Sequence, residues 1–481
     1  MSNSKNFYIN GAWVAPVISN DFDVINPSTE QVIDVISLGS AADVDIAVAA
    51  AGEAFDSWSQ TSKAERMALI EKLLDIYVAR NEEMGKAISM EMGAPIDMAS
   101  TSQSESGSWH TKGLMQSLRD FEFEHAFSER FPNDRLIYEP VGVCALITPW
   151  NWPMNQVVLK VVAALAAGCT MVLKPSEVAP LSGLLFSEIM HEAGFPAGVY
   201  NMINGDGMGV GNAMTGHAGV DMVSFTGSTR AGVAISKNAA DTVKRVALEL
   251  GGKGANIIFA DADEKAVVRG VRHCFGNSGQ SCNAPTRMLV ERSIYDQAVA
   301  TAIEVANKTQ VGHAAESGRH IGPVVSELQY NKIQGLIQAA IDQGSKLVAG
   351  GVGKPEGLET GYFVRPTVFA DVTNDMLIAR EEVFGPVLSI IPFDTEHEAI
   401  TIANDTVYGL TNYVQTTDGA KANRVARRLR SGMVEMNGKS RARGMPFGGY
   451  KQSGNGREGG VFGIEDFLEV KAVSGWDPDQ F

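Results

Sequence analysis

Short apolar runs separated by turn residues open the chain. Between residues 7 and 36 these runs alternate with turn signals such as Asn10-Gly11 and Asn26-Pro27. Runs of this length, bounded by asparagine, glycine and proline, are typical of antiparallel hairpins. We therefore expect the first strands of the chain to pair locally.

Helical periodicity follows the hairpins. Apolar positions recur with the spacing of an amphipathic helix over 43–59 and again over 62–92. Thr61 or Ser62 can cap the second helix, and Glu65 would complete a capping box. These features predict two long helices before the chain reaches a new pattern.

From residue 136 strand-like and helix-like runs alternate. The strand-like runs are 136–147, 170–174, 199–203 and 221–226, and the helix-like runs are 155–167, 180–192, 208–215 and 229–238. This alternation predicts a parallel sheet covered by helices on both faces. The segment before it, 121–135, is polar and lacks a clear period, so we expect a loop or an exposed excursion there.

A second series of the same kind begins near residue 252. Its strand-like runs are 255–259, 286–291, 345–349, 386–393 and 432–436, and its helix-like runs are 263–274, 294–308, 327–342, 396–404 and 418–430. The last run, 465–474, returns to strand character and could pair elsewhere. Together the two series predict an α/β fold.

The composition narrows the class of protein. A chain of 481 residues suggests about three domains. Hydrophobic residues make up 44% and charged residues 20%, as in globular proteins with large cores. A net charge of −16 disfavours nucleic acid and anionic membranes as partners. No run of about 18 apolar residues predicts a transmembrane helix.

The cysteines and the N-terminal residues indicate the cellular compartment in which we expect the protein. The cysteines at 144, 169, 274 and 282 form no CxxC pair, so we expect neither a metal site nor a disulfide scaffold. The N-terminal residues lack the apolar core of a signal peptide. Free thiols without a signal peptide fit a cytoplasmic protein.

One cysteine stands out by its neighbours. Cys282 lies between Ser281 and Asn283, in a stretch that is broken by Gly276, Gly279 and Pro285. Loops between rigid elements commonly present reactive side chains, whereas a cysteine that only packs a core usually has apolar neighbours. A catalytic cysteine and a small buried hydrophobe are both possible on this stretch alone.

Two further stretches follow predicted parallel strands, where ligands sit in open α/β sheets. Ser228 opens a helix after a glycine, so it either holds an anion at the helix N-terminus or simply caps the helix. Lys174 and Glu177 end another strand. They can hold two ribose hydroxyls or form a surface ion pair.

Asn151 and Glu249 are candidates for acid–base or oxyanion chemistry. Asn151 lies between two tryptophans and two prolines, so its amide can donate to a developing oxyanion or cap the next helix. Glu249 ends an apolar strand before a diglycine. It can be a general base with a raised pKa, or a member of a structural ion pair.

Seven motifs in one order carry a resemblance that extends from about residue 7 to 474. They are Pro149-Trp150-Asn151-Trp152-Pro153, Lys174-Pro175-Ser176-Glu177, Phe225-Thr226-Gly227-Ser228-Thr229, Glu249-Leu250-Gly251-Gly252-Lys253, Gly279-Gln280-Ser281-Cys282, Glu381-Glu382-Val383-Phe384-Gly385-Pro386 and Pro446-Phe447-Gly448-Gly449-Tyr450-Lys451. Their order and spacing resemble the NAD(P)-dependent aldehyde dehydrogenase superfamily. The resemblance implies an oxidoreductase that converts an aldehyde to a carboxylic acid.

The resemblance also implies catalytic roles. Cys282 matches the nucleophile, Asn151 and the Cys282 N–H match the oxyanion donors, and Glu249 matches the base that activates water to hydrolyse a thioester. Lys160 and Glu458 match a proton exit from that base. Members that acylate coenzyme A lack this glutamate, and structural members of the fold would lose the cysteine or the glutamate.

For the cofactor, the resemblance implies NAD, with NADP possible. Glu177 would accept from the 2′-hydroxyl of the adenine ribose and repel a 2′-phosphate. The positions that match cofactor contacts are Thr148, Pro149, Trp150, Lys174, Ser176, Glu177, Gly207, Gly211, Phe225, Thr226, Gly227, Ser228, Leu250, Glu382 and Phe384.

The resemblance says less about the substrate than about the cofactor. The positions that match the family's substrate pocket are Trp152, Gln156, Leu159, Ser281, Asn283, Arg441 and Phe447. Arg441 stands where several members carry an aromatic residue, so it either favours an anionic semialdehyde or is a solvated loop charge.

The resemblance implies three structural parts. A variant Rossmann cofactor domain would comprise residues 1–119 and 142–251, and an α/β catalytic domain would comprise 252–464. A small β extension, 120–141 and 465–481, would be exchanged between the subunits of a homodimer or homotetramer.

Overall fold

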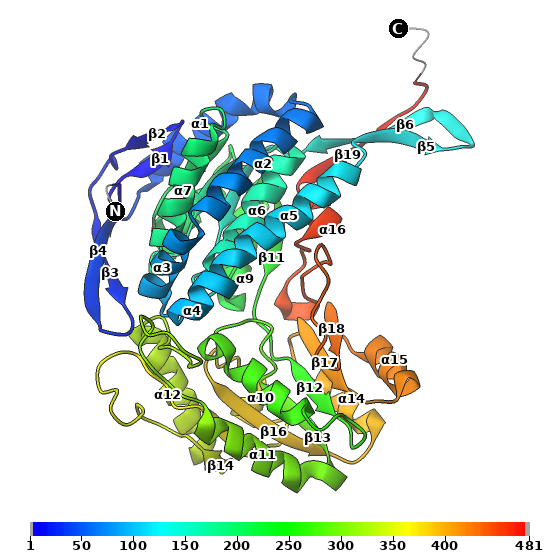
Figure 1. The fold of residues 1–481 in the computed structure, drawn as a ribbon. Helices are drawn as coiled ribbons and strands as arrows, with labels where there is room; N and C mark the ends of the chain where they lie inside the picture. Colours follow the sequence, from blue (N-terminus) through cyan, green and yellow to red (C-terminus); the bar gives the residue numbers. More distant parts are fainter. Residues whose placement is uncertain (1–2, 477–481) are drawn as a thin grey trace.

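The computed structural model describes residues 3–476 and contains two seven-stranded sheets (Figure 1). The first sheet has the order β11-β10-β7-β8-β9-β1-β2. Its strands are β1 (Phe7–Ile9), β2 (Ala12–Val14), β7 (Val143–Ile147), β8 (Thr170–Lys174), β9 (Tyr200–Met202), β10 (Met222–Thr226) and β11 (Arg245–Glu249). The strands from β11 to β9 are parallel, and the β1–β2 hairpin extends the sheet through an antiparallel bridge between Tyr8 and Met202.

Helices cover both faces of this sheet, as the alternating pattern predicts. Along β7, Val143, Ala145 and Ile147 pack against α1 (Ala41–Ser59) and α9 (Thr229–Ala239). Cys144 and Leu146 point to the other face. That face is covered by α2 (Lys63–Ala79), α3 (Asn81–Met92), α5 (Ser104–Asp120), α6 (Pro153–Ala167) and α7 (Leu181–Ala193).

The second sheet has the order β14-β15-β16-β13-β12-β17-β18. Its strands are β12 (Ala255–Ile258), β13 (Arg287–Glu291), β14 (Lys346–Ala349), β15 (Thr367–Ala370), β16 (Val387–Phe393), β17 (Thr411–Gln415) and β18 (Met433–Met436). Only β14 is antiparallel to its neighbour. The helices α10 (Ala266–Phe275) and α11 (Tyr295–Lys308) cover one face, and α12 (Glu327–Asp342), α14 (Glu396–Asn404) and α15 (Gly419–Arg428) cover the other.

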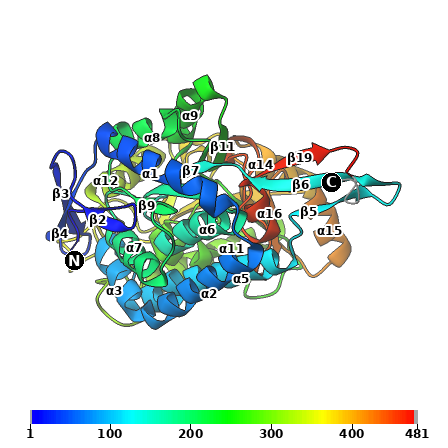
Figure 2. The same cartoon turned by 90° about the horizontal axis from the view of Figure 1, so that it is seen from above.

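A three-stranded antiparallel sheet projects from the body of the molecule (Figures 1 and 2). It has the order β19-β6-β5, from β5 (Glu124–Ser128), β6 (Phe131–Pro140) and β19 (Leu468–Val473). The predicted strand 465–474 therefore pairs with a segment more than 300 residues earlier. A separate hairpin, β3 (Asp21–Asn26) and β4 (Gln31–Ser37), lies near the N-terminus. Residues 477–481 of the predicted extension and residues 1–2 lie outside the described part.

Three of the predicted elements are wrong in their bounds. The single helix predicted at 62–92 is two helices, which meet at Arg80, whose guanidinium binds Glu83, Glu188 and Glu192. The single strand predicted at 136–147 is β6 and β7, because Gly142 adopts a positive φ of 128° between them. The helix predicted at 208–215 begins as a π-helical turn, Gly207–Gly211, before α8 (Asn212–Gly216).

Other elements escaped prediction. The segment 121–135, which by its local pattern could be a loop or an exposed excursion, contains β5 and the first part of β6, within the β extension that the resemblance implies. The helix α4 (Ile96–Met98) continues through a π-helical turn, Ala99–Gln103, into α5. The strands β15 and β17 are short, and α13 (Leu377–Arg380) and α16 (Gly460–Glu465) have about one turn each. The predicted cap of α2 is Ser62, which forms the capping box with Glu65.

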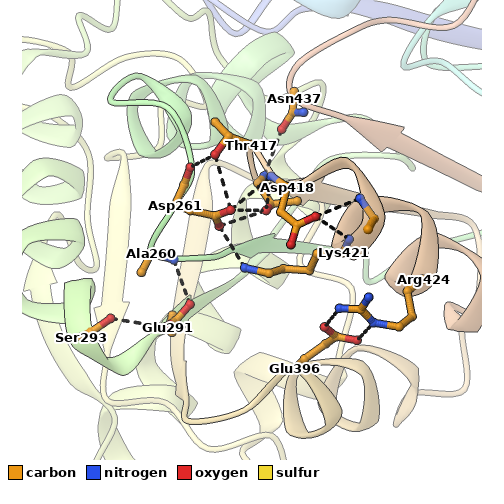
Figure 3. A network of polar contacts seen from close by, with 12 residues as sticks. Ala260, Asp261, Glu291, Ser293, Glu396, Thr417, Asp418, Lys421, Arg424 and Asn437 are labelled. Carbon is orange, nitrogen blue, oxygen red and sulfur yellow. Dashed lines mark hydrogen bonds and ion pairs between the residues drawn. The ribbon is translucent and has the colours of Figure 1, made fainter.

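A network of polar contacts fixes α15 to the carboxyl ends of β12 and β17 (Figure 3). Asp261 accepts hydrogen bonds from the Thr416 hydroxyl and the Asp418 N–H, and it pairs with Lys421. The Asp418 carboxylate caps α15 by accepting from the N–H groups of Ala420 and Lys421. This network orders a helix and has no unpaired carboxylate. Within residues 3–476, no helix is both long and apolar enough to cross a bilayer.

Candidate active site

A cavity of about 190 Å³ opens between the two large sheets. Its lining brings together ten of the predicted site residues with three that were not predicted. The ten are Pro149, Trp150, Asn151, Thr226, Gly227, Ser228, Leu250, Cys282, Glu382 and Phe384. The three are Gly251, Gln329 and Lys332. Segments from both sheets thus meet where the sequence motifs predict one site.

The Cys282 loop is anchored at the two residues that precede the cysteine. The Trp152 indole donates to the Ser281 hydroxyl at 2.8 Å, and the Asn151 side-chain amide donates to the Gln280 carbonyl at 3.1 Å. Asn151 does not cap α6, which begins after Trp152 without a side-chain cap. Cys282 is half-buried, whereas the other three cysteines are buried. It is thus the thiol with the most access to a ligand.

The electrostatic surroundings keep this thiol protonated. Burial, together with the negative charges of Glu382 and Glu249, raises the pKa of Cys282 to about 12, although Arg441 acts in the opposite direction. A thiol with this pKa carries little thiolate at neutral pH. A nucleophilic attack by Cys282 therefore needs a nearby group that takes its proton.

Glu249 is the carboxylate suited to that task. It ends β11, is only 4% exposed, and neither of its side-chain oxygens has a hydrogen-bond partner among the described residues. Burial and the neighbouring Glu458 raise its pKa well above the ordinary value, against the pull of Lys160 and Arg457. A buried carboxylate with free lone pairs and a raised pKa is a competent general base.

Behind Glu249 lies a buried ion pair. Lys160, on α6, contacts a side-chain oxygen of Glu458 and donates to the Thr226 hydroxyl at 2.7 Å. Both Lys160 and Glu458 are less than 10% exposed, and the second Glu458 oxygen has no partner among residues 3–476. These are the two residues that the sequence predicts beside the base.

At the carboxyl end of β8, at the same edge of the first sheet, a cation is held away from solvent. Lys174 is 3% exposed, and its ammonium donates to the carbonyls of Pro175 and Gly205 and to Glu177 at 3.4 Å. Burial lowers its pKa, while Glu177 favours the charged form. Lys174 and Glu177 therefore do not form a surface ion pair, because Lys174 is buried and only Glu177 reaches the surface.

The loop that contains Glu382 and Phe384 is held in a strained conformation. Glu382 accepts from the Gly252 N–H at 2.8 Å, and Phe384 has a positive φ of 58°. Gln329 donates to the Phe384 carbonyl at 2.8 Å, and Lys332 donates to the Glu382 carbonyl at 3.1 Å. These bonds explain why α12 lines the cavity. No motif in the sequence marks Gln329 or Lys332, because their partners are main-chain atoms far along the chain.

The chain matches the model of the aldehyde dehydrogenase family over residues 13–473. It belongs to this family. It is 52% identical over 479 residues to a 3-succinoylsemialdehyde-pyridine dehydrogenase of a Pseudomonas species, covering 99% of this chain and 100% of that protein. The fold is α/β of the aldehyde dehydrogenase type, and the enzyme is an NAD(P)-dependent oxidoreductase.

Solved structures support the same fold. The aldehyde dehydrogenase of Bartonella henselae matches with a TM-score of 0.98 and 60% identity, covering 98% of this chain and 99% of that one. Aldehyde dehydrogenase C of Pseudomonas syringae, a mutant in complex with NAD+ and octanal, matches with a TM-score of 0.97 and 48% identity, covering 99% and 98%. Bound NAD+ in such neighbours identifies the cofactor of the family.

The dehydrogenase has the features that a dinucleotide needs. Ser228 caps α9 by accepting from the Ala231 N–H, so the other first-turn N–H groups remain for a phosphate. The Ser-capped helix and the anion site are thus compatible readings of one motif. Gly207 has no atom within 4 Å of the place where a Cβ would stand, which leaves room beside it. The residues present therefore fit NAD.

The predicted substrate residues lie outside the lining of this cavity. Trp152, Gln156 and Leu159 are at the start of α6, and Gln156 keeps one buried oxygen without a partner within residues 3–476. Asn283 accepts from the Tyr413 hydroxyl through its carbonyl at 2.6 Å, so its main chain is fixed by β17.

Arg441 is not an unpaired cation. Its guanidinium pairs with Glu435 at 3.3 Å and stacks over the Phe447 ring at 4.6 Å. Sequence reasoning missed Glu435, and it also missed His110, whose Nε2 accepts from the Asn155 amide at 2.7 Å. Burial, with the charge of Arg441, lowers the pKa of His110 to about 3. Its ring is therefore neutral.

Proposed function

We propose that this enzyme oxidises an aldehyde to the free carboxylic acid, with Cys282 as the nucleophile and Glu249 as the general base. The observation that carries this proposal is the buried Glu249 carboxylate, which has no hydrogen-bond partner within residues 3–476 and is close enough to Cys282 for its charge to affect the thiol. Asn151 completes the set, because one hydrogen of its side-chain amide is free for an oxyanion.

Each step follows from these side chains. Glu249 takes the thiol proton, and the Cys282 sulfur bonds to the aldehyde carbon, so that the carbonyl electron pair moves to oxygen. The Asn151 amide and the Cys282 N–H stabilise that oxyanion. Bound NAD+ supplies the acceptor for the hydride, which leaves a thioester on Cys282. After Glu249 has passed on the thiol proton, it deprotonates water, which attacks the thioester carbon. The C–S bond breaks, the Cys282 thiolate takes a proton from Glu249, and the acid is released.

Lys160 and Glu458 would carry the proton away from Glu249. The Lys160–Glu458 pair is buried, and the Glu458 oxygen without a partner can accept a proton. Because Lys160 lowers and Glu458 raises the pKa of Glu249, the pair also sets the pH range of the base.

The reaction class can be tested with NADH absorbance. Octanal, benzaldehyde and succinic semialdehyde are each added with NAD+, with and without coenzyme A. We expect NADH formation that does not need coenzyme A. Strict dependence on coenzyme A would indicate an acylating dehydrogenase, and no NADH with any aldehyde would favour a non-catalytic member.

Cys282→Ala should abolish NADH formation while NAD+ still binds, because only the bond-forming atom is lost. Cys274→Ala is the matched control, since Cys274 is buried on α10, in a hydrophobic core cluster, and its thiol donates to the Val387 carbonyl. We expect it to lose stability and not turnover. Substantial residual turnover of the Cys282 variant would remove this residue from the role of nucleophile.

Glu177 supports a preference for NAD over NADP. One of its oxygens faces Lys174, and the side chain is 30% exposed, so the carboxylate can accept from a ribose hydroxyl and would repel a phosphate. The same part of the site includes Ser176, Gly211 and Phe225 as predicted contacts. Glu177→Ser should shift the ratio of kcat/KM toward NADP, and a wild type that already prefers NADP would contradict this assignment.

An anionic semialdehyde is the second candidate for the substrate. Arg441 favours it, and the relative named above acts, by its name, on a semialdehyde. Glu435 opposes it, because this carboxylate already pairs with Arg441. Octanal, which is bound in a neighbour, has no charge. A higher kcat/KM for succinic semialdehyde than for butanal, lost in Arg441→Ala, would select the anionic class.

The projecting sheet supports a homodimer or homotetramer. Its strands expose Phe127, Phe131 and Val470, which a second subunit could cover. The two large sheets and the projecting sheet support a division into a cofactor domain, a catalytic domain and this extension. The free thiols fit the cytoplasm. Sedimentation of the purified enzyme tests the assembly.

A further inference from the structure

A buried glutamine connects the cofactor-side helices to the Cys282 loop. Gln103 is fully buried and ends the π-helical turn between α4 and α5. Its Nε2 donates to the Asn151 carbonyl at 3.1 Å and to Asn277 Oδ1 at 3.1 Å. A π-helical turn adds one residue to a helix and is frequent at functional sites. Here the turn ends at Gln103, whose amide contacts two loops, the one that contains Asn151 and the one that contains Asn277.

Asn277 continues the connection. Its amide donates to the Asn151 carbonyl at 2.9 Å and to the Gln280 carbonyl at 3.1 Å. The Gln280 carbonyl also accepts the Asn151 side-chain amide. Asn151 is therefore held at its main-chain carbonyl by two donors and at its side chain by one acceptor.

The orientation of each amide is forced. Both the Gln103 and the Asn277 nitrogens face a main-chain carbonyl, which can only accept. Reversing either amide would place two oxygens together. The order of donors is thus fixed, and the second hydrogen of the Asn151 amide is the one left for an oxyanion.

The main chain of this loop is strained at two positions. Asn277 and Ser278 both have positive φ angles, 53° and 55°, which non-glycine residues rarely adopt. Ser278 is tied by its hydroxyl to the Gly322 carbonyl at 2.7 Å. At Asn277, the N–H and side-chain amide of Gln280 donate to the carbonyl from within the loop, and Gln103 donates to Oδ1 from outside it. Strain of this kind persists only where surrounding bonds determine it.

We propose that Gln103 is a positioning residue, which directs the free hydrogen of the Asn151 amide toward the oxygen of an aldehyde bonded to Cys282. Gln103 acts through Asn151 and Asn277. This inference rests on the proposed function, because it presumes that Asn151 stabilises an oxyanion. Removing the Gln103 donor would loosen Asn151 without changing the thiol.

The test compares two reactions of Cys282. Hydride transfer needs the oxyanion donors, whereas alkylation by iodoacetamide does not. Gln103→Met keeps the volume and removes the donor. With the aldehyde of the panel that wild type oxidises fastest and saturating NAD+, we expect the rate of the first NADH per site to fall about 10- to 100-fold. The rate of alkylation should stay within about 2-fold of wild type, because it does not use the oxyanion site.

Asn201→Leu is the matched control. Asn201 is another fully buried amide that donates to two main-chain carbonyls, those of Met171 and Gly198, but it lies in β9. It should lose stability and keep the rate of hydride transfer. If Gln103→Met does not fold, Gln103→Asn keeps the amide and shortens its reach, and it should show the same split between the two reactions.

An unchanged NADH rate in Gln103→Met or Gln103→Asn would overturn the inference. An equal fall in alkylation would also overturn it, because the cysteine loop itself would then have moved. A wild type that forms no NADH with any aldehyde would instead contradict the proposed function.

Discussion

Two carboxylates at the ends of parallel strands have opposite surroundings. Glu249 ends β11 of the first large sheet, and Asp261 follows β12 of the second. Glu249 is buried with no hydrogen-bond partner among the described residues, and burial raises its pKa. Asp261 accepts from Thr416 and Asp418 and pairs with Lys421, and these contacts lower its pKa although burial acts against them.

The difference distinguishes a carboxylate that orders a helix from one whose oxygens have no hydrogen-bond partner among the described residues. The Asp261 oxygens accept hydrogen bonds that order α15 (Figure 3). The Glu249 carboxylate has lost its hydration on burial without gaining hydrogen bonds in return. Such unpaired buried groups are rare in folded proteins, and groups with a strongly shifted pKa cluster at functional sites. Both are acidic residues after an apolar strand, so the number of hydrogen bonds, and not the position, distinguishes them.

The largest expected effect is on the turnover rate, which should depend on Glu249 and not on Asp261. Glu249→Gln should lower the steady-state rate of NADH formation by about 100-fold or more, because water then lacks its base. The matched Asp261→Asn variant should keep the wild-type rate. The measurement is NADH absorbance on a stopped-flow instrument, with the fastest aldehyde of the panel.

The time course of NADH formation shows which step of the reaction depends on Glu249. If Glu249 acts mainly on the thioester, its variant should show a first burst of about one NADH per site before slow turnover. Equal loss of the burst and the steady state would mean that Glu249 is also required to deprotonate Cys282. A large loss of turnover in Asp261→Asn would contradict the distinction between the two carboxylates.

A second, smaller effect concerns the pH at which Glu249 works. Lys160 lowers the pKa of Glu249, so Lys160→Met should raise it further and move the acid limb of the kcat profile to higher pH. Glu458 raises that pKa, so Glu458→Gln should move the limb to lower pH. Hydrolysis of the thioester needs the deprotonated base, so activity falls as pH drops below the limb in each case.

Breaking a buried pair on one side can destabilise the enzyme. The double variant Lys160→Met/Glu458→Gln removes both charges and should restore folding, with a limb between those of the single variants. Identical limbs in all four proteins would show that Glu249 does not set the pH dependence.

Much of this architecture could be predicted from the chain alone. The apolar strands β8, β10 and β13 and the helices α11, α12 and α14 lie close to their predicted bounds, because long runs with clear periods leave few alternatives. Through the family resemblance, the motifs also predicted Cys282, Asn151 and Glu249 in one site. Cys282 and Asn151 line the cavity between the two large sheets, whereas Glu249 is not among the residues that line it.

Other features could not be predicted because they depend on distant partners. Gly142 reads as a strand residue, although its φ separates β6 from β7. Gln103 lies in a segment without a motif, and only the fold brings its amide to Asn151. Glu435 reads as a strand residue until Arg441 is seen to pair with it. Local patterns predict elements well, but they do not show which polar side chains remain unpaired.

The smallest expected effect is on stability, and its sign differs between the two carboxylates. Glu249 has a folded pKa above its unfolded value, so the folded state holds its proton more tightly. Its contribution to stability therefore becomes unfavourable as pH rises through that window. Glu249→Gln should be more stable than wild type at pH 8, and the gain should shrink as pH falls.

Asp261 should give the opposite slope. Its folded pKa is lowered, so its stabilising contribution is present above the unfolded pKa and is lost as pH falls through the folded pKa. Asp261→Asn should cost about 1–2 kcal/mol at pH 7, because hydrogen bonds to a charged acceptor are weakened. That loss should shrink toward pH 3. Urea unfolding of both variants and wild type, followed by tryptophan fluorescence at several pH values, measures the two slopes. Parallel slopes would mean that Glu249 has partners in solution, and the contrast between the two carboxylates would then disappear.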